Sequence, residues 1–142
     1  MKAAPIENEI WTIWIHRGVE DVDKHMALGI KAMRVGARQL ALREFTKVIL
    51  LDPEFAEGWN KRATVYYMLG ELDKSVRDIQ RTLALEPRHY GAISGMGLIY
   101  DATNNVEGAL KAWQRVLDIT PYNPHVKQRV LDLKAKLNGK PI

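Results

Sequence analysis

Four histidines are the side chains best suited to metal binding or proton transfer, and they are scattered along the chain. They stand at His16, His25, His89 and His125. They form no His-Glu-x-x-His pattern, and the 142-residue chain contains no cysteine, so zinc-binding spacings and a thiolate nucleophile are both missing. We therefore expect no metal site and no cofactor.

Hydroxyl and glycine residues give no better candidate for catalysis. Thr64, Ser75 and Ser94 have no base at a spacing that would activate them. The glycine-rich stretch 91–97, GAISGMG, neither follows a strand nor shows the glycine order of a phosphate-binding loop. The sequence predicts a protein that is not an enzyme.

A repeat dominates the chain instead. Pro53, Pro87 and Pro121 are 34 residues apart and close the similar phrases ILLDP, LALEP and LDITP. Such a period indicates stacked copies of one supersecondary unit. We place three copies at residues 22–55, 56–89 and 90–123.

Each copy has the pattern of two amphipathic helices. Apolar or small residues recur three and four apart, and a breaker stands between the two helices. The breakers are Gly36, Gly70 and Asn104-Asn105, residue types that tolerate the left-handed conformation at a helix end. The closing proline then stops the second helix. The unit is a helix-turn-helix hairpin.

Small residues mark where these helices approach each other. Two series recur at the repeat interval, and a side chain larger than serine in either would push neighbouring helices apart. They are Gly29, Ala63 and Gly97, then Ala41, Ser75 and Ala109. Residues 124–137 form a further amphipathic helix that covers the last hairpin, with Asn138-Gly139 ending it and a basic tail to residue 142.

These residues resemble the tetratricopeptide repeat family over residues 22–123. The resemblance rests on the period and on residues of all three copies: Leu28, Gly29, Ala41, Phe45 and Pro53, then Trp59, Ala63 and Tyr66, then Gly97, Tyr100, Ala109, Trp113 and Pro121. His25, Ala32 and Arg62 depart from the family pattern. The resemblance implies an all-α, right-handed solenoid of three repeats with N-terminal and C-terminal capping helices, similar to small stand-alone bacterial members.

The family's inner face is formed by known positions of each first helix, and the resemblance implies a groove that binds a peptide or helix of a partner protein. Carried over by register, the groove residues are Met26, Ile30, Met33, Arg34, Asn60, Lys61, Thr64, Tyr67, Ser94, Leu98 and Asp101. One subclass clamps the carboxylate of chaperone tails with basic and amide side chains. The matching positions here keep one base, Lys61, so we expect no such clamp.

The N-terminal region, residues 1–21, carries the stretch NEIWTIWIHRG from Asn8 to Gly18, which predicts a short helix ended by Gly18 and followed by a linker. Its apolar residues cover about twice the arc of a helix with one buried side. Three alternatives stay open: a cap on the first hairpin, a homodimer or partner surface at Trp11 and Ile15, and a plug in the groove.

Charge and hydropathy limit the other partners. The net charge of +4 lies wholly in residues 122–142, and no segment has the ~20 apolar residues of a membrane span. We expect no nucleic-acid partner and no membrane span. Alternatives to the adaptor are a homodimeric structural module and a domain that binds a lipid or small molecule. The compartment stays open: cytoplasmic by default, or periplasmic if a signal peptide was removed.

Overall fold

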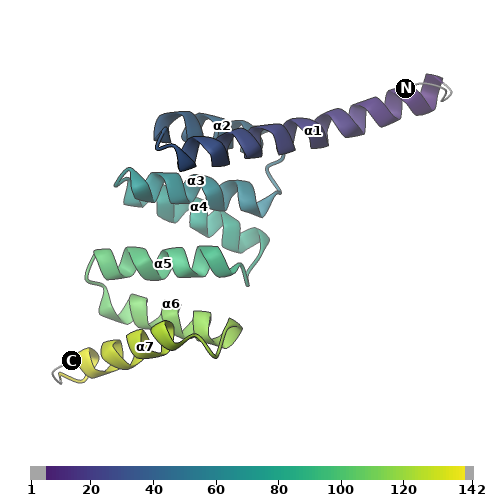
Figure 1. The fold of residues 1–142 in the computed structure, drawn as a ribbon. Coiled ribbons are helices and arrows are strands. Elements are labelled where there is room, and N and C mark those ends of the chain that lie inside the picture. The colour runs from purple at the N-terminus through teal and green to yellow at the C-terminus, as the bar shows by residue number, and fades with distance from the viewer. Residues whose placement is uncertain (1–5, 140–142) are drawn as a thin grey trace.

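The computed structural model describes the backbone of residues 6–139 and the side chains of residues 20–139. This part of the chain is all α-helical, with seven helices and no strand. The helices are α1 (Ile6–Arg34), α2 (Arg38–Leu51), α3 (Ala56–Met68), α4 (Leu72–Leu85), α5 (Tyr90–Ala102), α6 (Val106–Ile119) and α7 (Pro124–Leu137). They pair as antiparallel hairpins, α1 with α2, α3 with α4 and α5 with α6, which stack in chain order (Figure 1). The predicted all-α repeat fold is confirmed.

The three hairpin turns use the residues that the sequence predicts. Gly36 and Gly70 have φ of 78° and 77°, and Asn104 is the one non-glycine residue with positive φ between residues 6 and 139, at 59°. Most residues rarely adopt this left-handed conformation, whereas glycine adopts it readily and asparagine more often than other residues do. Each turn therefore reverses the chain at a residue suited to it.

One predicted boundary is wrong. Gly18 was expected to end a short N-terminal helix, but α1 continues through it from Ile6 to Arg34. A glycine inside a helix costs only about 1 kcal/mol relative to alanine. It ends a helix when the following residues favour a turn, and the stretch after Gly18 contains neither proline nor asparagine.

The predicted close approaches lie inside the first and third hairpins. An added methyl group at Gly29 would lie 2.4 Å from the Phe45 ring, and one at Gly97 would lie 2.5 Å from the Trp113 ring. In the second hairpin the same register pairs Ala63 with Ile79, both buried. The first helix of the outer hairpins therefore lies directly against a ring of its partner helix.

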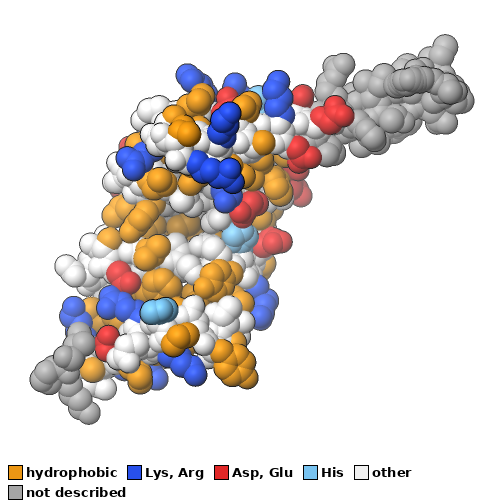
Figure 2. Space-filling view, viewed as in Figure 1, with side chains coloured by type: hydrophobic (Ala, Val, Ile, Leu, Met, Phe, Trp, Pro, Cys, Tyr) orange, Lys and Arg blue, Asp and Glu red, His pale blue; other side chains and the backbone are white. Residues whose placement is uncertain are grey.

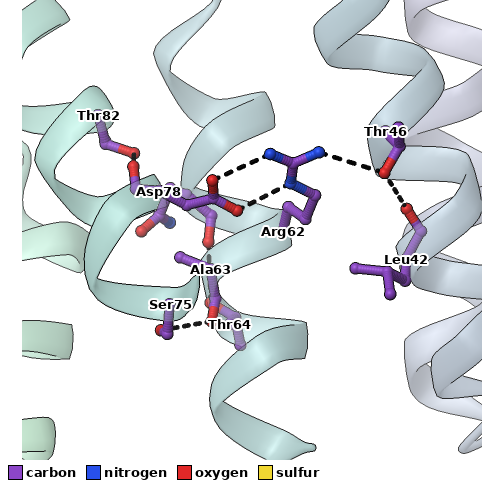
Figure 3. A network of polar contacts seen from close by, with 9 residues as sticks. Leu42, Thr46, Arg62, Ala63, Thr64, Ser75, Asp78 and Thr82 are labelled. Carbon is purple, nitrogen blue, oxygen red and sulfur yellow. Dashed lines mark hydrogen bonds and ion pairs between the residues drawn. The ribbon is translucent and has the colours of Figure 1, made fainter. Parts of the chain in front are cut away.

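Arg62, which stands where the family has a leucine, is accommodated by a buried acid. Its guanidinium donates to both carboxylate oxygens of Asp78 on α4, at 2.8 and 3.0 Å, and to Thr46 on α2 at 3.3 Å (Figure 3). Burial alone would lower the pKa of Arg62, but the hydrogen bonds and charge of Asp78 outweigh it and raise this pKa above its usual value. Arg62 thus links three helices.

A second polar pair replaces another family residue. His25 on α1, which stands in place of a tryptophan, lies with its Nδ1 2.6 Å from the buried Glu44 carboxylate on α2. The hydrogen bond to His25 lowers the pKa of Glu44; burial opposes this shift and Lys47 adds to it. The first hairpin is therefore held in part by a hydrogen bond between its two helices.

The C-terminal helix has the predicted bounds. In α7, Val126, Val130 and Leu133 are buried, and the first two belong to the core of the third hairpin. Asn123 caps its N-terminus by accepting from the Val126 amide, and Gly139 follows it with φ of 72°. Leu137, the last residue of the helix, is about half exposed. α7 covers the end of the stack, as predicted.

Candidate functional site

The first helices of the hairpins, α1, α3 and α5, form one side of the molecule, which Figures 1 and 2 view from the front; we call it the inner face. A hollow of about 130 Å³ opens on the inner face between α3 and α5. Eleven residues line it: Asn60, Ala63, Thr64, Tyr67, Ser75, Ile79, Gly91, Ser94, Gly95, Leu98 and Ile99. The space-filling view shows this hollow between the second and third hairpins (Figure 2).

Small residues of α5 keep this space open. Gly91, Ser94 and Gly95 face α3 and add almost no side-chain volume. Ile79 of α4 lies behind them, and an added methyl group at Gly95 would lie 3.2 Å from its Cδ1. The hollow therefore has a narrow apolar floor formed by the second hairpin's own core.

The walls are mostly apolar, and two large side chains stand at the edge. Leu98 is 45% exposed, and Tyr67 is partly buried against the core residues Ala63, Ile79, Ala92 and Ile99. One buried polar atom stands out: Ser94 Oγ has no hydrogen-bond partner among the described residues. Unpaired buried hydroxyls are uncommon, because each costs about 1–3 kcal/mol. The hollow thus offers apolar contact together with one unused donor.

A polar cluster borders the hollow at the start of α3 and α5. The Glu57 carboxylate accepts from His89 Nε2 at 2.7 Å and from Asn60 at 3.4 Å, and lies 3.7 Å from Lys61 Nζ. His89 Nδ1 accepts from the Ala92 amide and so caps α5. Because Nδ1 accepts, Nε2 carries the ring proton and donates the hydrogen bond to Glu57. Lys61 is thus already held by an acid.

Five of the residues predicted by register line this hollow together. They are Asn60, Thr64, Tyr67, Ser94 and Leu98. Three others, Met26, Ile30 and Met33, lie on α1 partly buried against the core of the first hairpin, and Arg34 is exposed in the last turn of that helix. The predicted set therefore divides into a hollow at α3 and α5 and an apolar strip on α1.

Asp101, predicted as a residue of the groove, is bound within the chain. Its carboxylate accepts from Trp113 Nε1 at 3.1 Å and from the Arg129 guanidinium at 2.6 Å. These contacts join α5 to α6 and α7, so Asp101 holds the C-terminal cap in place. The two remaining candidates, Trp11 and Ile15, have side chains outside the described residues.

Sequence reasoning missed the pairing of His89 with Glu57. The sequence signal was weak, because the two residues are 32 positions apart and belong to different hairpins. A histidine directly before a helix start was the available clue, since that position favours a side chain that accepts from a free amide.

Two further findings concern the described residues as a whole. They contain no cluster of three or more histidine or acidic side chains able to hold a metal ion. None of their helices combines the length and the hydropathy that crossing a bilayer requires.

Known proteins are similar to this chain in sequence and in architecture. The family model "Tetratricopeptide repeat" matches residues 56–89. A TPR repeat-containing protein of Rhizobium etli is 39% identical over 138 residues, which is 97% of this chain and 68% of that protein.

Two solved structures are similar in fold. The first TPR domain of Spaghetti (RPAP3), bound to an HSP90 peptide, superposes with a TM-score of 0.77 at 24% identity, covering 84% of this chain and 97% of that one. MamA superposes with a TM-score of 0.75 at 24% identity, covering 83% of this chain and 68% of that one. At these identities the likeness supports the fold alone.

Proposed function

Since the chain belongs to the tetratricopeptide repeat family, we propose that it is a non-catalytic adaptor whose inner face binds a helix or an extended segment of a partner protein. Proteins of this family mediate protein–protein interaction, and the similar Spaghetti domain was solved with a bound peptide. The observation that carries the proposal is the hollow between α3 and α5, which exposes apolar surface on the inner face.

The size of the hollow favours a polypeptide side chain over a small molecule. Its volume is about 130 Å³, whereas small-molecule sites usually occupy about 300–1,000 Å³. A cavity of about 150 Å³ is known to hold a benzene-sized group. The hollow would therefore receive one apolar anchor, such as a leucine or phenylalanine, while the rest of the segment contacts the surrounding surface.

The apolar strip on α1 extends this surface toward the first hairpin. Met26, Ile30 and Met33 are partly buried and leave part of each side chain on the inner face. Methionine has three rotatable bonds and adapts to differently shaped partners. A segment anchored in the hollow would continue over these residues, as an amphipathic helix does in a groove.

A carboxylate clamp for chaperone tails finds little support. Lys61, the one base at the matching positions, lies beside Glu57, and the positions on α5 are Gly91 and Gly95. We expect a peptide with a free acidic C-terminus of the chaperone type to bind no better than its amidated form, in a titration followed by fluorescence anisotropy.

The test of the groove is a charge placed at its mouth. Leu98→Glu adds a carboxylate beside the hollow, at a side chain exposed enough that folding should be unaffected. The matched control is Leu50→Glu on α2, at a leucine that is 77% exposed. Proteins retained by immobilised wild type from a lysate of the source cells would be crosslinked and identified by mass spectrometry.

We expect Leu98→Glu to lose the partner that crosslinks to α3 and α5, and Leu50→Glu to keep it. Burying an unpaired carboxylate in an apolar site costs several kcal/mol, enough to reduce binding by at least about a hundredfold. Full retention of that partner by Leu98→Glu, or crosslinks confined to other surfaces, would contradict the proposal.

A further inference from the structure

Cations and aromatic rings alternate along one side of the second hairpin. Arg62 lies 5.3 Å from the centre of the Trp59 ring and 5.6 Å from that of Tyr66. Arg81 lies 5.5 Å from the Trp59 ring, and Lys74 lies 5.7 Å from the Tyr66 ring. The order is therefore Arg81, Trp59, Arg62, Tyr66, Lys74, which we call the cation–ring ladder.

The ladder lines a shallow groove of about 360 Å³ between α3 and α4, away from the hollow of the inner face. Arg77 completes its lining, and Asp78 is the single acid in it. Asp78 is buried and bound by Arg62. It therefore neutralises Arg62 and none of the other cations in the groove. Arg77 and Arg81 make no ion pair within the described part of the chain. Lys74 has one exposed pair with Glu71, and such pairs contribute at most about 1 kcal/mol.

The groove therefore carries three exposed positive charges in excess. Lys74, Arg77 and Arg81 are three and four residues apart on α4, so they project from one side of the helix. A guanidinium stacked near a ring still has its N–H edge free for hydrogen bonds. The contact between Arg81 and Trp59 restricts the arginine before any ligand arrives, which reduces the entropy lost on binding.

We propose that the cation–ring ladder and Arg77 bind an extended, acidic segment of a partner protein. Charge complementarity identifies the occupant: carboxylates match the free guanidinium edges in a bidentate geometry. Lys74 and Arg81 are separated by about 10 Å along the helix axis. Acidic residues at every second position of an extended chain lie about 7 Å apart on one side, so two or three such residues span the three cations.

The same geometry argues against single-stranded nucleic acid. Proteins that bind it offer aromatic faces on which bases stack. Trp59 and Tyr66 each have two cations within 5.7 Å of the ring centre, which leaves little ring surface for a base. The groove offers charge without stacking, and this combination suits an acidic polypeptide.

The probe is a short fluorescein-labelled peptide that alternates glutamate with serine, titrated with the full chain in an anisotropy experiment at low ionic strength. A glutamine–serine peptide and a thymidine oligonucleotide of similar length are the comparison ligands. The variant is Arg77→Gln with Arg81→Gln. Its matched control is Arg38→Gln with Arg88→Gln, which removes the same charge at two exposed residues outside the groove.

We expect the glutamate peptide to bind wild type and the control, and to bind the groove variant at least about tenfold more weakly, as the loss of charge-assisted contacts predicts. Equal weakening in the control would overturn the proposal, because bulk charge would then explain the binding. Tighter binding of the oligonucleotide, equal binding of the glutamine peptide, or no binding at all would overturn it too. Leu98→Glu should bind the glutamate peptide normally, so this test is independent of the inner face.

Discussion

The middle hairpin and its two neighbours fill the same structural position with different residues. In the first and third hairpins a glycine lies against a ring, Gly29 against Phe45 and Gly97 against Trp113. In the second hairpin Ala63 meets Ile79, and both residues line the hollow of the inner face. The hollow therefore lies at the hairpin that departs from the glycine–ring pairing, where Ile79 stands in place of a ring and α5 contributes small residues.

The middle hairpin should depend most on the pair of Arg62 with Asp78. In Asp78→Ala the arginine would stay largely buried without its acid, so we expect a loss of about 3–5 kcal/mol in the free energy of unfolding. Urea denaturation followed by circular dichroism measures it. Asp73→Ala, at an exposed acid of the same helix, should change stability by less than about 0.5 kcal/mol; similar losses in both variants would refute this role.

The flanking hairpins should instead be sensitive to any side chain at the glycine. A methyl group in Gly97→Ala would lie 2.5 Å from the Trp113 ring, and we expect this overpacking to cost about 1–3 kcal/mol in urea denaturation. Trp113→Leu removes the ring that the added methyl group meets. This substitution should therefore lower the free energy of unfolding by less in the Gly97→Ala variant than in wild type. Strictly additive losses would show that the methyl group does not meet the ring.

The middle hairpin should be convertible to the flanking type. Ile79→Phe alone places a ring against the methyl group of Ala63 and should lose about 1–3 kcal/mol. Ala63→Gly with Ile79→Phe recreates the neighbours' pairing, so thermal and urea unfolding should recover to within about 1 kcal/mol of wild type, the residual cost of a helical glycine.

In that double variant the ring should also occupy the hollow. We expect the partner captured on the inner face to be lost although the chain is folded, while the acidic peptide still binds the ladder groove. Retention of the inner-face partner would show that the hollow is not its anchor.

The smallest expected effect is the loss of stability at low pH that depends on Glu44. The pKa of Glu44 lies below its usual value of 4.5 in the folded chain, so the folded state binds this proton more weakly than the unfolded state. This contribution to stability is complete above about pH 4.5 and is lost as the pH falls through the lowered pKa. As the pH is lowered from neutral to about 3, the urea midpoint of Glu44→Gln should therefore fall less steeply than that of wild type. An unchanged slope would contradict it.

Much of the fold could be predicted because it depends on local and periodic features. The turns at Gly36, Gly70 and Asn104 follow from residue types that accept positive φ, and the limits of α7 follow from its flanking residues. Gly18 misled the prediction, since one glycine without a following breaker does not end a helix.

The candidate site was predictable only in part, because register gives the face of a helix and not the partner of a side chain. Register predicted Asn60, Tyr67 and Leu98 on one surface, and the three residues line one hollow; that a partner binds there stays a prediction. The engagement of Asp101 by Arg129 depends on how α7 lies across α5 and α6, which the repeat does not determine.

The cation–ring ladder had a sequence signal that went unused. Trp59, Arg62 and Tyr66 have the same three- and four-residue spacing as Lys74, Arg77 and Arg81. Recognising it requires knowing that the two sides meet across one hairpin. For Trp11 and Ile15, the cap, dimer and plug hypotheses stay predictions, which removal of residues 1–18 would distinguish through stability, mass or partner affinity.

The position of the hollow has a mechanical consequence. Each hairpin packs on the next in line, and α4 packs less extensively on α5 than α2 does on α3. The hollow lies at this junction, so a ligand bound there would contact the second and third hairpins at once. A ligand bound in the hollow would then restrict motion between these two hairpins. The curvature of the solenoid that a second ligand meets would depend on whether the first ligand is bound.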